Sequence, residues 1–167
     1  MRSSNLIFVA MLLGMPVPCM GKQVLVLGVG PSVPVGDLAA GRRIGVHGIG
    51  MVHFGPARAV SFRIDASYSH FWAKEVGPGV NESARVVALG INAVVALRRR
   101  RTVSPYALAG LGTQTSTQDC PGTRTSASLT GGVGVRVRRV RLEGRVLLGA
   151  TGCNSTYHIP FTVALSF

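Results

Sequence analysis

The chain has 167 residues, 47% of them hydrophobic and only 14% charged, and it carries a net charge of +12. Beyond the N-terminal segment, no apolar run reaches the roughly 18 residues of a transmembrane helix, which excludes a helical membrane protein. The six Phe, three Tyr and one Trp are not interleaved with the basic residues, which argues against a nucleic-acid partner. High apolar content without long apolar runs is typical of alternating strands.

Residues 1–21 are predicted to be a secretory signal peptide, followed by a mature domain of residues 22–167. Arg2 supplies the positive start, residues 6–15 form an apolar core, and two prolines precede a small-residue cleavage site after Gly21. A short buried helix is the alternative interpretation. Export would place the mature chain in an oxidising compartment.

Alternation of apolar with small or polar residues runs along the whole mature chain and indicates strands. We expect eight strands, in chain order at residues 23–33, 44–54, 59–70, 84–97, 104–113, 126–138, 140–148 and 157–167. The third of them alternates most strictly. Its apolar face carries Val60, Phe62, Ile64, Ala66 and Tyr68. The pattern leaves open which way the first and the fifth strand face.

The connections alternate between long and short. The first, third, fifth and seventh are longer and polar, and one of them is expected to be a loop over residues 114–125. The second, fourth and sixth are short turns. An even strand number with this alternation predicts an all-β, eight-stranded, antiparallel up-and-down transmembrane β-barrel. A secreted soluble β-sandwich that binds an anionic ligand through its basic face is the alternative.

The last predicted strand ends the chain on an aromatic residue, with apolar residues at every second position before it. These are Ile159, Phe161, Val163, Leu165 and Phe167. With the export signal and the eight strands, this ending resembles the family of small bacterial outer-membrane β-barrels of the OmpA/OmpX-like type. The resemblance implies a monomer in the cell outer membrane, in contact with outer-membrane lipid and without a cofactor. It also implies that the outer-membrane assembly machinery reads Phe161, Val163, Leu165 and Phe167, so a charged residue at position 167 should impair assembly more than Ser166→Ala.

Charged and polar residues gather on the faces expected to point into the barrel. They are Arg63, Asp65, Asn92, Arg136, Glu143 and Arg145. An eight-stranded barrel has an interior just wide enough for side chains to fill, so we interpret this cluster as a plug of paired charges. Because Arg outnumbers acid among these residues, a narrow anion-favouring, porin-like pore is the alternative.

Two cysteines fall in the fifth and the seventh connection, which are neighbours at the predicted external rim. A disulfide between Cys120 and Cys153 is expected in an exported protein, with two free thiols as the alternative. The second short turn contains Arg98–Arg101, which we interpret as a solvated basic turn that could touch lipid phosphates.

No catalytic or metal site is predicted. The four histidines, including His47 and His158, are scattered, and no metal-ligand spacing appears. Ser69 and His70 are adjacent in a strand and therefore point to opposite faces, so they cannot form a nucleophile–base pair with each other. Some members of the family modify lipids, and such an enzyme is the alternative to a structural or small-solute permeability role.

Overall fold

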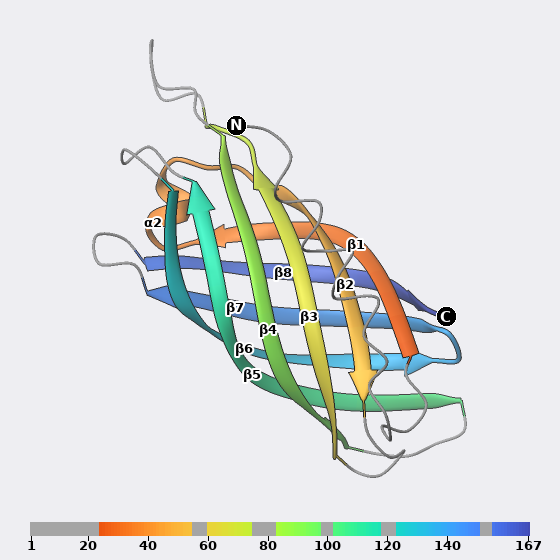
Figure 1. The fold of residues 1–167 in the computed structure, drawn as a ribbon. Coiled ribbons are helices and arrows are strands. Elements are labelled where there is room, and N and C mark those ends of the chain that lie inside the picture. Colours follow the sequence, from red (N-terminus) through yellow and green to blue (C-terminus); the bar gives the residue numbers. More distant parts are fainter. Residues whose placement is uncertain (1–23, 55–59, 75–82, 98–101, 118–122, 151–154) are drawn as a thin grey trace, which may run out of the picture.

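The computed structural model describes residues 24–54, 60–74, 83–97, 102–117, 123–150 and 155–167 of the chain (Figure 1). Its strands form one closed antiparallel barrel in which each strand pairs with its neighbours in the sequence and the last pairs back with the first. The strands are β1 Val24–Val35, β2 Gly45–Phe54, β3 Val60–Phe71, β4 Ala84–Ala96, β5 Val103–Thr117, β6 Thr123–Val137, β7 Val140–Ala150 and β8 Ser155–Ser166. The predicted fold class is confirmed, and a β-sandwich is excluded by the closure.

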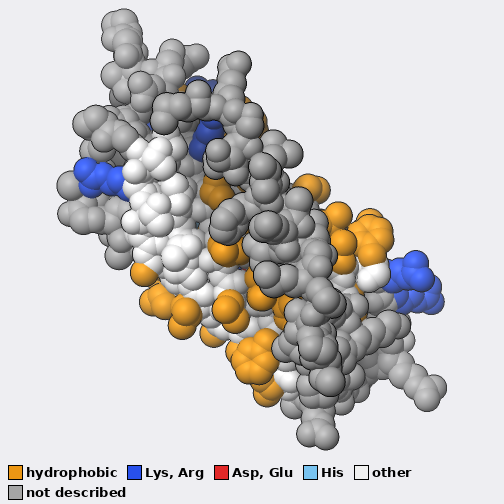
Figure 2. All heavy atoms as spheres, viewed as in Figure 1, with side chains coloured by type: hydrophobic (Ala, Val, Ile, Leu, Met, Phe, Trp, Pro, Cys, Tyr) orange, Lys and Arg blue, Asp and Glu red, His pale blue; other side chains and the backbone are white. Residues whose placement is uncertain are grey.

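The outward face of the barrel is apolar around its middle because every strand places large hydrophobic residues there, at alternate positions. Leu27, Ile91, Leu111 and Val163 are each more than half exposed. Figure 2 shows hydrophobic side chains gathered in a band across the visible face of the molecule. A continuous apolar surface of this extent is unfavourable in water and favourable against lipid, so the barrel spans a membrane with its strands. None of the helices in the described part of the chain is long and apolar enough to cross a membrane.

The structure resolves the facing of the two strands that the pattern left open. In β1, Leu25 and Val29 face outward and are exposed, whereas Val26 and Ser32 are buried in the lumen. In β5, Tyr106 and Gln114 are buried in the lumen, and Leu111 faces outward. The lumen therefore receives large polar side chains from a strand whose sequence, with Pro105 and two glycines, gave no clear alternation.

The expected loop at residues 114–125 is wrong over most of its length. Residues up to Thr117 continue β5, and β6 begins at Thr123, so the two strands pair through Thr115↔Thr125 and Thr117↔Thr123. The side-chain oxygens of Thr115 and Thr125 lie 2.9 Å apart in a cross-strand hydrogen bond. Threonine fits a pleated strand well, but a polar strand that extends past the apolar band has no hydrophobic alternation to reveal it.

The two ends of the barrel differ. One end, here called the turn end, contains the start of β1, the end of β8 and the tight connection between β6 and β7 (Figure 1). At the other, the loop end, a short helix α2, Asp37–Ala40, lies in the first connection. Its Leu38 is buried in an apolar cluster with Phe71, Ala84 and Val86 at this end of the barrel.

Candidate functional site in the lumen

Four charged side chains meet in the middle of the lumen and form what is here called the ionic quartet: Arg63, Asp65, Glu143 and Arg145. Arg63 and Asp65 come from β3, whereas Glu143 and Arg145 come from β7. Within each strand the two residues are two positions apart, so both side chains leave the same face of the sheet. All four are nearly inaccessible to solvent, at 0–5% exposure.

The quartet is joined by ion pairs within each strand and between the strands. Arg63 Nη1 donates to Glu143 Oε2 at 2.8 Å, and Arg145 Nη1 donates to Asp65 Oδ2 at 2.7 Å. Arg63 Nε lies 2.7 Å from Asp65 Oδ1, and Arg145 Nε contacts Glu143 Oε1. Each guanidinium therefore faces both carboxylates, and the four formal charges sum to zero.

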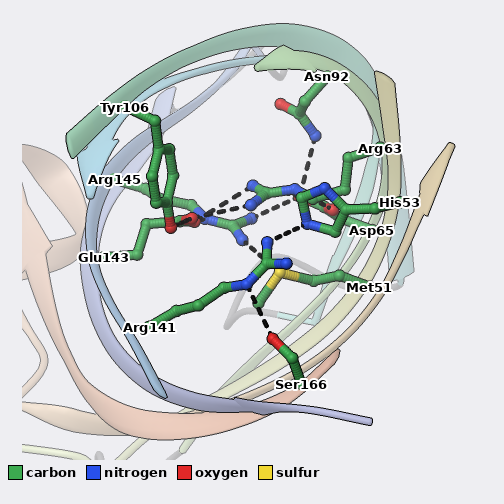
Figure 3. A network of polar contacts seen from close by, with 10 residues as sticks. All are labelled: Met51, His53, Arg63, Asp65, Asn92, Tyr106, Arg141, Glu143, Arg145 and Ser166. Carbon is green, nitrogen blue, oxygen red and sulfur yellow. Dashed lines mark hydrogen bonds and ion pairs between the residues drawn. The ribbon is translucent and has the colours of Figure 1, made fainter. Parts of the chain in front are cut away.

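Two neutral side chains complete the coordination of the carboxylates (Figure 3). Tyr106 Oη donates to Glu143 Oε2 at 2.6 Å, and Asn92 Nδ2 donates to Asp65 Oδ2 at 2.9 Å. The Tyr106 ring lies against Gly134 of β6, where a Cβ would collide with it. A small residue on the next strand thus makes room for a ring that reaches the centre of the barrel.

The ion pairs of the quartet connect opposite sides of the barrel. β3 and β7 are separated by three strands in either direction around the closed sheet, so they lie on opposite sides of the lumen. The Arg63–Glu143 and Arg145–Asp65 pairs therefore cross the barrel axis. Isolated charges in such a dry interior would cost several kcal/mol each, on the order expected for buried ions, and mutual pairing offsets that cost.

A third arginine, Arg141, lies between the quartet and the turn end. Its side chain is 5% exposed, its Nε donates to Ser166 Oγ at 3.0 Å, and a second nitrogen of the guanidinium contacts His53 Nε2. Figure 3 shows it below the quartet, directed to His53 and Ser166. Arg136, predicted as part of the plug, is exposed at the end of β6 and lies outside these contacts.

A separate layer of neutral polar side chains fills the lumen towards the loop end. His47, Ser69, Gln114 and His158 are buried there, and His47 Nδ1 lies 2.8 Å from Ser69 Oγ. His158 packs its ring edge-on against Phe71, at 5.6 Å between ring centroids. The adjacent Ser69 and His70 do point to opposite faces, and the hydroxyl instead meets a histidine of the neighbouring strand.

The His47–Ser69 pair has the atoms of a nucleophile and a base, yet its setting differs from that of a working pair. Both side chains are at most 2% exposed. No group of three or more His, Cys, Asp and Glu side chains that could hold a metal ion occurs among the described residues. We therefore derive no reaction from this layer.

The barrel is similar to solved structures of bacterial outer-membrane proteins. Neisserial surface protein A (NspA) matches with a TM-score of 0.62 and 15% identity, over 89% of this chain and 99% of that one. The Yersinia pestis outer membrane protein Ail matches with a TM-score of 0.56 and 11% identity, over 87% of this chain and 100% of that one. The outer membrane enzyme PagL matches with a TM-score of 0.55 and 11% identity, over 86% of this chain and 98% of that one.

These likenesses extend over nearly the whole length of each chain and concern the fold. The sequence itself matches no family profile and no characterised protein. The class that fold and surface define is an eight-stranded transmembrane β-barrel of the kind found in bacterial outer membranes, as the sequence predicted.

The predicted site residues divide into three groups. Arg63, Asp65, Asn92, Glu143 and Arg145 are brought together, whereas Arg136 lies apart from them. The residues predicted to be the assembly signal face outward: Phe161, Val163 and Leu165 of β8 are about half exposed, and Phe167, which follows β8, is 73% exposed. The predicted signal peptide, Arg98–Arg101, Cys120 and Cys153 lie outside the described residues, so the signal peptide and its cleavage site, the basic turn and the disulfide stay predictions.

The predicted lumen cluster left out Tyr106 and Arg141. Tyr106 lies in the strand whose facing the pattern left open, and nothing in its neighbourhood signalled a buried hydroxyl. Arg141 shares the inward parity of Glu143 and Arg145, so its place in the lumen could have been inferred from the same alternation. Ser166 also gains a role, because its hydroxyl accepts the hydrogen bond from Arg141.

Proposed function

We propose that the protein is a monomeric integral protein of the bacterial outer membrane whose lumen is sealed by the ionic quartet, so that its role is structural rather than that of a pore. The observation that carries this proposal is the pair of ion pairs across the barrel axis, Arg63–Glu143 and Arg145–Asp65. A solute could pass only if these contacts separated. Separation would leave buried charges without partners, which is strongly unfavourable.

The alternative of an anion-favouring pore was based on an excess of arginine over acid. Inside the quartet that excess disappears, since two guanidinium groups face two carboxylates. The buried apolar cluster of Leu38, Phe71, Ala84 and Val86 lies at the loop end and supports the same interpretation. The ion pairs across the axis and the apolar cluster at the loop end both favour a closed lumen over a narrow channel.

Efflux from liposomes tests the proposal. The mature chain is inserted into phosphatidylcholine vesicles that contain a small anionic dye and, in a parallel sample, small sugars. We expect release at the rate of protein-free vesicles for both. The matched variant replaces Glu143 and Asp65 by alanine together with Arg63→Ala and Arg145→Ala, and it should release solute faster if it inserts. Rapid release by the wild type would contradict the sealed lumen.

A further inference from the structure

The buried Arg141 lacks a counter-ion. Its contacts are the neutral Ser166 hydroxyl and the ring of His53, and within the described parts of the chain it forms no ion pair with a carboxylate. The nearest acidic side chain on its own strand, Glu143, is already occupied by Arg63, Arg145 and Tyr106. A guanidinium buried to this extent normally has an anionic partner.

A second arginine lies directly opposite the first. Arg136 of β6 and Arg141 of β7 are Cα partners in the antiparallel register, so their side chains leave the same face of the sheet. Like charges at directly opposite positions destabilise a strand pair. An anion held between the two guanidinium groups would convert this repulsion into attraction.

The connection that joins these strands adds two more exposed arginines. Arg138 and Arg139 form the two-residue turn between β6 and β7. Arg138 has a φ of 55°, which makes it the only non-glycine residue with positive φ in the described ranges. A glycine or asparagine would adopt this conformation with less strain.

The surroundings indicate which anion fits. Next to these arginines, Val137, Val140 and Phe167 are exposed and continue the apolar band to its edge at the turn end. The exposed Arg136, Arg138 and Arg139 therefore lie at the boundary between lipid and water, where phosphate groups are concentrated, and the buried Arg141 is the cross-strand partner of Arg136. A guanidinium fork matches the oxygens of a phosphate, and several cations suit a phosphate better than a single carboxylate.

From this juxtaposition we infer that the turn end of the barrel contains a phosphate-binding site formed by Arg141 and Arg136, with Arg138 and Arg139 at its rim. The phosphate belongs either to the headgroup of a phospholipid in the surrounding leaflet or to a free phosphate ion in the adjacent aqueous compartment. In both cases its oxygens accept hydrogen bonds from Arg141 on the lumen side and from Arg136 at the mouth. The site lies apart from the quartet and does not require the lumen to be closed.

Calorimetric titration of the mature chain in maltoside micelles, which contain no phosphate, tests this inference. One titrant is inorganic phosphate, and the other is short-chain phosphatidylglycerol. We expect saturable binding of at least one titrant with a stoichiometry of one. Binding of the lipid alone identifies a headgroup as the ligand, and binding of phosphate with equal or higher affinity identifies the free ion.

Three variants give the test its specificity. Arg136→Gln removes an exposed side chain, so the barrel should fold, and the affinity should fall by about tenfold or more, as expected for loss of one charge-assisted contact. Arg141→Gln should abolish saturable binding. Arg85→Gln removes the same charge from an exposed position at the loop end and should leave the affinity unchanged. If the wild type binds neither titrant, or if Arg136→Gln and Arg85→Gln weaken binding equally, the inference is wrong.

Discussion

The lumen contains two polar regions that differ in how completely their side chains are paired. In the ionic quartet every charged group faces an opposite charge, and the carboxylates receive further hydrogen bonds from Tyr106 and Asn92. In the layer towards the loop end, several buried neutral atoms have no hydrogen-bond partner within the described protein. They are Ser32 Oγ, His47 Nε2, both amide atoms of Gln114, and His158 Nδ1. In the described part of the chain, Arg63 Nε and Asp65 Oδ1 of the quartet also lack a hydrogen bond, but they face each other in an ion pair at 2.7 Å, and the neutral Asn92 Oδ1 has no partner.

The difference follows from the free energy of leaving each kind of group unpaired. An unpaired buried charge costs on the order of 3–5 kcal/mol, whereas an unpaired neutral group costs about 1–3 kcal/mol. Loss of pairing in the quartet therefore costs more than the missing hydrogen bonds of the neutral layer. Closure of the lumen, in this account, depends on the quartet, and the neutral layer fills space.

The largest expected effect is loss of a buried guanidinium. Arg63→Met leaves Glu143 and Asp65 with only one cation between them, and we expect the free energy of unfolding to fall by about 3–5 kcal/mol. The control Arg85→Met removes an exposed guanidinium and should change it by less than about 0.5 kcal/mol. Urea unfolding in phosphatidylcholine vesicles, followed by the fluorescence of the single Trp72, measures both. If the free energy of unfolding falls equally in the two variants, the ion pairs of the quartet do not stabilise the barrel.

A charge on the outer face tests the contrast between the lumen and the lipid surface. Ile91 lies in the middle of β4 and faces outward, so Ile91→Arg should lower the free energy of unfolding by about 2–4 kcal/mol, as for a charge at the bilayer midplane. Thr117→Arg, at the end of β5 beyond the apolar band, should have little effect. Both variants can be followed by the loss of the faster-migrating, unboiled species in SDS electrophoresis. A wild-type mobility that is unaffected by boiling would count against the barrel.

Removal of a single hydroxyl isolates one contact of the quartet. Tyr106→Phe deletes the hydrogen bond to Glu143 and keeps the ring over Gly134, so we expect a loss of about 1.5–3 kcal/mol, the range for a hydrogen bond to a charged group. Tyr68→Phe makes the same chemical change on the outward face and should be nearly neutral. Denaturant midpoints of the two variants in the same vesicles distinguish them. If Tyr106→Phe is also neutral, the hydroxyl does not contribute to the network.

The neutral layer should tolerate what the quartet does not. Gln114→Met keeps the volume of the side chain and removes an amide without a protein partner, so stability should change by less than about 1 kcal/mol or rise slightly. Asn92→Leu removes the donor to Asp65 and should cost more. The comparison is made by urea unfolding, and the reverse order of the two effects would overturn the distinction between the regions.

The fold was predictable because a membrane barrel imposes strict alternation of residues between lipid and lumen, and strands such as 59–70 display it directly. The same parity identified Arg63, Asp65, Glu143 and Arg145 as lumen residues. Their meeting across the axis depends on the strand number, because only in an eight-stranded barrel do β3 and β7 lie opposite each other. The extended ends of β5 and β6 were missed, since threonine-rich strands beyond the lipid carry no hydrophobic period.

The position of Tyr106 could not be predicted for a related reason. Its strand contains Pro105 and small residues on both faces, so no apolar alternation set its facing. The space for its ring comes from Gly134 of the neighbouring strand, and pairing between Tyr106 and Gly134 is known only once the register is known. Contacts between strands can therefore be identified only from the structure. The face on which a residue lies can mostly be predicted from its odd or even position along the strand.

The most direct test of the sealed lumen is a conductance measurement in planar lipid bilayers with the mature wild-type protein inserted. The ion pairs across the axis predict an electrically silent protein, with no steps of current at moderate voltage in salt solution. Insertion is verified independently by the heat-dependent mobility of protein recovered from the same preparation. Regular, stepwise currents from verified wild-type protein would contradict the account and would favour the pore.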